Sequence, residues 1–102
     1  MKIYVTGIGI VSPIGLNAAA NLESLSLGRS GILRSEEFNL MMGQVSLNNE
    51  ALLELLHLKD QDYSRTMLLG LLAAKEAWSL NQLSEKIRTG MVGATSIGGL
   101  DK

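Results

Sequence analysis

The chain has 102 residues and a mass of 11.0 kDa, which suits one small domain or a part of a larger one. Its 46% hydrophobic and 19% charged residues are typical of a globular protein and exclude a disordered chain. A net charge of -1 provides no basic surface for nucleic acid, and the absence of cysteine excludes disulfides, thiolate zinc sites and a cysteine nucleophile within these residues. The single histidine, His57, cannot form a multi-histidine metal site by itself. We therefore expect no metal site, no bound cofactor and no nucleic-acid partner.

Only residues 1–20 resemble a targeting signal, because they combine Lys2 with an apolar stretch and three small residues at 18–20. Three glycines and Pro13 interrupt that stretch, and it carries a single charge, which argues against a signal peptide. No run reaches the roughly 18 apolar residues that span a bilayer. We expect a cytoplasmic protein without a membrane span.

The first elements are predicted to be a strand, a turn and a helix. Residues 2–11 are apolar on both faces, which is typical of a strand covered on both sides in an α/β sheet. Residues 12–15, with Pro13, predict a turn. Asn17 is a candidate N-cap for a helix to residue 27, in which Ala18, Leu22 and Leu25 recur at helical spacing and after which Gly28 is placed for a C-terminal cap.

The middle of the chain predicts two more helices. Residues 29–47 are less regular, and residues 43–47 are a candidate short edge strand. Asn48 or Asn49 is expected to cap a short helix through Leu56, whose apolar face would contain Leu52, Leu53, Leu55 and Leu56. After a polar break at residues 59–62, a long helix is predicted with Asp62 or Ser64 as its cap. Its apolar face would contain Met67, Leu71, Ala74 and Trp78 at i, i+4, i+7 and i+11, with Leu68 and Leu72 beside them.

Residues 91–95 predict a second buried strand, and residues 96–100 follow as a glycine-rich loop at its carboxyl end. In open α/β sheets ligands bind beyond the carboxyl ends of the strands, and both glycine-containing turns of this chain are expected there.

Two glycine motifs have a ligand interpretation and a structural one. Residues 7–12 begin like a dinucleotide fingerprint, but Ser12 takes the third glycine position, and Glu36 and Glu37 lie beyond the usual place of the ribose-binding acid. Glycines within a strand more often mark close backbone approach or a bulge. Residues 93–99 resemble a phosphate-binding loop without its Gly-Lys-Ser/Thr, so a turn that allows positive φ is favoured.

Two charged side chains are also ambiguous. His57 follows a leucine-rich helix and is interpreted as an exposed or C-terminal helix residue that the helix dipole stabilises, rather than as a general base. Arg65 opens the long helix, where a cation opposes the dipole. That position indicates a specific tertiary partner, although a solvated arginine fits equally well.

Together these segments resemble the amino-terminal part of a β-ketoacyl-acyl-carrier-protein synthase. Four blocks carry the resemblance in order and cover nearly the whole chain: residues 5–15 (VTGIGIVSPIG) followed by 26–32 (SLGRSGI), residues 64–70 (SRTMLLG), residues 73–77 (AAKEA) and residues 92–100 (VGATSIGGL).

The resemblance implies an α/β fold: the amino-terminal part of a thiolase-like fold, a mixed sheet layered with helices, incomplete in this chain. Residues 1–102 would be the amino-terminal portion of the synthase's N-terminal domain, with the rest of that domain and the carboxy-terminal half absent. The family condenses an acyl thioester with malonyl-acyl carrier protein and releases CO2, in fatty-acid, polyketide or aryl-polyene synthesis. It works as a dimer, its partners are the acyl carrier protein with its phosphopantetheine thioester and the malonyl thioester, and it needs no metal or organic cofactor of its own.

The family's nucleophilic cysteine, two histidines and lysine match no position here, and His57, Lys75 and Lys102 lie outside the catalytic motifs. We therefore assign no catalytic, cofactor-binding or metal-binding residue, and expect the 102-residue chain alone to be inactive and poorly folded without complementary sequence. The alternatives are a non-catalytic partner subunit that resembles the chain-length factors, in a homodimer or heterodimer, and a small nucleotide-binding module.

Overall fold

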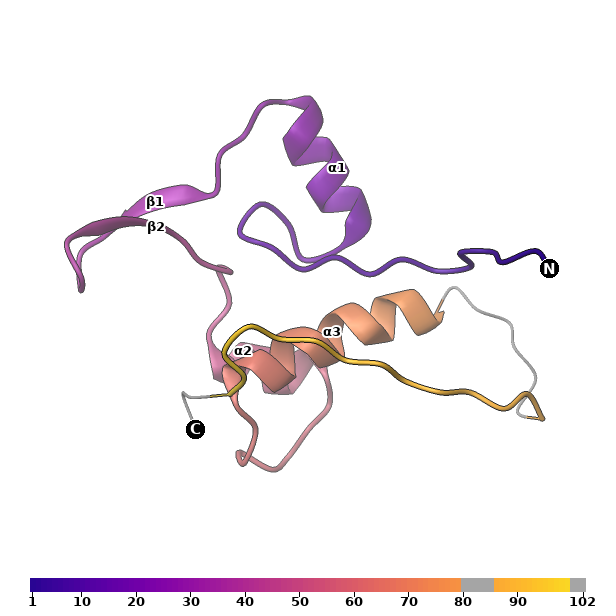
Figure 1. Cartoon of the computed structure of the whole chain (residues 1–102). Helices are drawn as coiled ribbons and strands as arrows, with labels where there is room; N and C mark the ends of the chain where they lie inside the picture. Colours follow the sequence, from indigo (N-terminus) through magenta and orange to yellow (C-terminus); the bar gives the residue numbers. More distant parts are fainter. Residues whose placement is uncertain (80–85, 100–102) are drawn as a thin grey trace.

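The structure, a computed structural model, describes residues 1–79 and 86–99. Within these residues the elements are, in chain order, α1 (Ala18–Ser26), β1 (Ile32–Ser35), β2 (Leu40–Gly43), α2 (Asn49–Leu55) and α3 (Arg65–Ser79) (Figure 1). This part of the chain therefore combines three helices with one two-stranded antiparallel sheet, so its α/β character is confirmed at that level.

The bounds and caps predicted for α1 are confirmed. The Asn17 side chain accepts a hydrogen bond of 2.7 Å from the amide of Ala20, which satisfies one of the free N–H groups of the first turn. At the other end Gly28 has a φ of 66°, and the amide of Arg29 donates to the carbonyl of Ser24 over 2.9 Å. A left-handed residue with this backward hydrogen bond is a Schellman ending, which favours glycine because other residues pay a steric cost there.

The predicted edge strand at residues 43–47 is wrong, because the strand lies earlier in the chain. β1 and β2 form an antiparallel hairpin in which Ile32 faces Gly43. A four-residue loop joins them and ends at Asn39 with a φ of 52°, and the Arg34 guanidinium donates to the Asn39 side chain. Asn39 thus supplies the positive φ that closes this loop.

The helices α2 and α3 pack together and contain the fully buried apolar side chains of the described chain. Asn48 caps α2 through a 2.8 Å hydrogen bond from the Ala51 amide, and Ser64 caps α3, as two of the sequence alternatives predict. Leu52 of α2 and Leu68 of α3 each have an exposed fraction of 0%. The core is therefore small and lies between these two helices.

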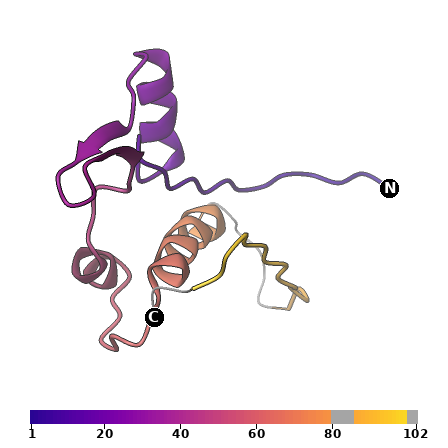
Figure 2. The same cartoon turned by 60° about the vertical axis from the view of Figure 1, so that its left-hand side comes forward.

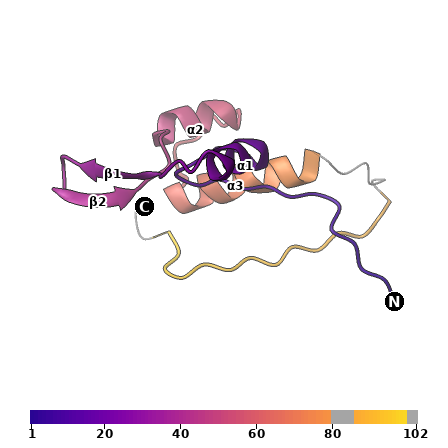
Figure 3. The same cartoon turned by 90° about the horizontal axis from the view of Figure 1, so that it is seen from above.

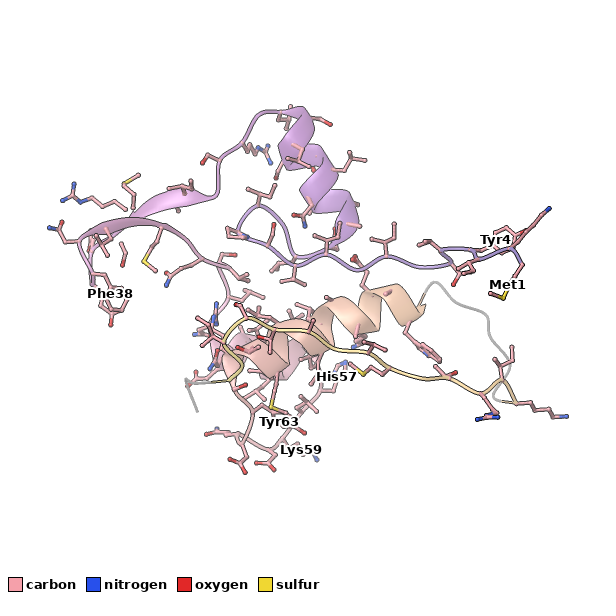
Figure 4. The ribbon with its side chains drawn as sticks, in the orientation of Figure 1. Met1, Tyr4, Phe38, His57, Lys59 and Tyr63 are labelled. Carbon is pink, nitrogen blue, oxygen red and sulfur yellow. The ribbon has the colours of Figure 1, made fainter. Side chains whose placement is uncertain are left out.

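Both predicted buried strands are wrong as strands. Residues 2–11 and 91–95 are extended, yet no ladder among the described residues includes them. Their apolar side chains are exposed: Val5 is 82%, Met91 88% and Val92 99% accessible, and Tyr4 points away from the other elements (Figure 4). A strand needs a backbone partner, and no other described strand lies beside either segment to supply one.

The predicted apolar face of α3 is confirmed only at its flank, and its central positions are exposed. Met67, Leu71 and Trp78 are 48%, 40% and 54% accessible. Leu68, which was predicted beside that face, is fully buried and Leu72 is half-buried, because α2 and the amino-terminal segment pack on neighbouring faces. Periodicity identified the helix, but the positions of its neighbours determine which apolar positions are covered.

The two extended segments run in the same direction on two sides of α3, from its carboxyl end toward its amino end (Figures 1 and 3). Figure 2 shows α1 and the hairpin on one side of the amino-terminal segment and the two packed helices on the other. The chain is correspondingly open, with a radius of gyration of 15.8 Å where a compact chain of this length has about 13 Å. No helix in the described ranges has both the length and the apolar character to cross a membrane.

Candidate functional site

A polar cluster joins the first turn of the chain to α1. The backbone of Ser12 and Gly15 closes the turn through two hydrogen bonds of 2.9 and 3.2 Å, which confirms the turn predicted at residues 12–15. The Asn21 side chain, only 5% exposed, donates to the carbonyls of Ile10, Gly15 and Asn17 at 3.3, 3.0 and 2.8 Å. These partners satisfy the buried amide, so its role is to hold the turn against the helix.

Glu76 of α3 forms the second part of this cluster. Its Oε1 accepts hydrogen bonds of 3.0 Å from the amides of both Ile10 and Ala18, and its Oε2 accepts one of 2.9 Å from Ala18. Ala18 is the first residue of α1, and α1 has no acidic residue in its own first turn. A carboxylate from another helix therefore supplies the negative charge that the α1 dipole favours. Sequence reasoning missed Glu76, and the missing acid in the first turn of α1 was the available signal.

This arrangement opposes dinucleotide binding at residues 7–12. A pyrophosphate would need the free amides at the start of α1, but Glu76 and Asn17 already occupy two of them, and the carboxylate would repel a phosphate. Gly9 serves a contact instead: a Cβ there would lie 1.8 Å from the carbonyl oxygen of Ala73. The glycine marks close backbone approach to α3, as the structural interpretation predicts.

The glycine-rich loop closes onto the start of α3. Gly98 has a φ of 80°, its amide donates to Thr95 Oγ1 at 3.1 Å, and its carbonyl accepts from Thr66 Oγ1 at 3.0 Å. A Cβ at Gly99 would meet Ser64 Oγ at 2.6 Å. The loop is thus a turn with positive φ, as favoured from the sequence, while residue 100 of that prediction lies outside the described residues.

Arg65 has the tertiary partners that its position indicated. Its guanidinium donates to Asn49 Oδ1 at 2.9 Å and to the carbonyls of Val45 and Leu47 at 3.0 and 2.9 Å. The planar fork thus holds the segment before α2 against the start of α3.

His57 is exposed and lies in the left-handed region just after α2, with a φ of 56°. Its amide donates to the Glu54 carbonyl at 3.1 Å, so it ends the helix in the manner of Gly28. An open apolar hollow of about 610 Å³ is lined by Leu16, Leu47, Ala51, Glu54, Leu55 and His57. No serine or threonine lines this hollow to act as a nucleophile beside the imidazole, and no group of three or more metal-ligating side chains gathers among residues 1–79 and 86–99.

Comparison with known proteins found no matching protein-family model, no matching curated protein and no matching solved structure.

Proposed function

We propose that this chain is the amino-terminal segment of a β-ketoacyl-acyl-carrier-protein synthase with a thiolase-like fold. The basis is the ordered set of four sequence blocks, which begins at residue 5 and ends at residue 100. In the complete enzyme an acyl thioester condenses with malonyl-acyl carrier protein and CO2 is released.

The observation that carries the proposal is the exposure of two segments that are apolar on both faces. Residues 3–5 and 91–92 present large apolar side chains that are 74% to 99% accessible. Such segments are stable in a sheet with helices on both sides, and they run in the same direction along α3, as neighbouring strands of a parallel sheet do (Figure 1). Additional strands and helices of a thiolase-like domain would provide that cover.

The total accessible area supports the same proposal. The chain exposes 8667 Å², whereas a compact monomer of 11 kDa exposes about 5,600 Å². The excess is about 3,000 Å² by that scaling, and exposed large apolar side chains such as Val5, Leu33 and Val92 contribute to it.

The residues described here have scaffold roles in this proposal. The turn held by Asn21, the Glu76 contact to α1 and the glycine loop at Ser64 set the ends of the two extended segments relative to α3. The nucleophile must come from sequence other than these 102 residues, which contain no cysteine. If the nucleophile position in that other sequence holds a cysteine, the protein is a synthase. If it holds any other residue, the protein is a partner subunit that resembles the chain-length factors.

The test uses the native polypeptide, isolated from its source with an antibody against this sequence. Intact mass spectrometry is expected to find a mass several-fold above 11.0 kDa, or a second polypeptide bound to this one. The material should release CO2 from malonyl-acyl carrier protein when an acyl-carrier thioester is present, and thiol alkylation should abolish that release because the nucleophile is a cysteine outside this chain. A lone 11.0 kDa species that unfolds cooperatively and releases no CO2 would contradict the proposal.

A further inference from the structure

We draw no further inference here: the strongest candidate, the open apolar hollow of about 610 Å³ beside α2 that Leu16, Leu55 and His57 help to line, carries none, because nothing in the described part of the chain shows whether a ligand or the rest of the proposed domain covers it.

Discussion

Replacing Glu76 should loosen the start of α1, although the two lie on helices far apart in the sequence. Its Oε1 alone accepts from the amides of Ile10 and Ala18, both at 3.0 Å, while Oε2 adds a 2.9 Å contact to Ala18. Glu76→Gln can keep its carbonyl oxygen at the Oε1 position and so retain one contact to each amide. Glu76→Ala removes every contact and leaves both amides without this acceptor.

The expected changes in the free energy of unfolding follow from the number of hydrogen bonds that each substitution removes. A hydrogen bond to a charged group contributes about 1.5–3 kcal/mol, and a carboxylate at a helix start adds about 0.3–1 kcal/mol. Glu76 is only half-buried, so the lower ends apply. We expect Glu76→Ala to lower the free energy of unfolding by about 3 kcal/mol and Glu76→Gln by about 1 kcal/mol, which is a large part of the stability of a small domain.

The assay uses the native polypeptide that carries this sequence and combines urea unfolding, followed by far-ultraviolet circular dichroism, with amide hydrogen exchange at Ile10 and Ala18. Exchange at both amides should accelerate in Glu76→Ala and change little in Glu76→Gln. Glu23→Gln removes an acidic charge from the body of α1 and serves as the control, with no expected change in either amide. If Glu76→Ala stays within about 0.5 kcal/mol of the wild type and leaves exchange unaltered, the proposed cap has no energetic role.

Three further substitutions test other contacts. Gly9→Ala should release the amino-terminal segment from α3, because its Cβ would lie 1.8 Å from a backbone oxygen that no rotamer change can move. Amide hydrogen exchange in that segment should become faster while the helix content stays the same. Unchanged protection of these amides would contradict the clash. His57→Gly should raise the free energy of unfolding by about 0.5–1 kcal/mol, since glycine adopts a φ of 56° without steric cost; a lower urea midpoint would show that the imidazole contributes more than the backbone strain. Arg65→Lys should lower it by about 1–2 kcal/mol, because an ammonium cannot reach one side chain and two carbonyls together, and an unchanged thermal midpoint would refute this.

Local sequence signals predicted the helices and their ends. Asn17, Asn48 and Ser64 cap helices through side-chain oxygens, and Gly28 ends α1 with a positive φ. Each of these features depends on residues within one or two turns, so the sequence contains the whole interaction.

Features that depend on distant partners could not be predicted in the same way. The apolar pattern of residues 2–11 correctly indicated extended backbone, but pairing requires a neighbouring strand that no local pattern supplies. The hairpin was missed because its loop ends at Asn39 without an Asn-Gly signal. Glu76 lies 58 residues from Ala18, which explains why no spacing rule identified their contact.

Arg65 closes a short stretch of the chain, residues 45–65, through hydrogen bonds to residues near its other end. Its bonds reach Val45 and Asn49, at most 20 residues away, and both fully buried leucines, Leu52 and Leu68, lie within or next to the loop so closed. Contacts of such short sequence separation form quickly, since little loop entropy opposes them. During synthesis this stretch can therefore take its native form soon after it leaves the ribosome, before residues 86–99 have emerged. It offers the growing polypeptide a folded nucleus while later residues are still emerging.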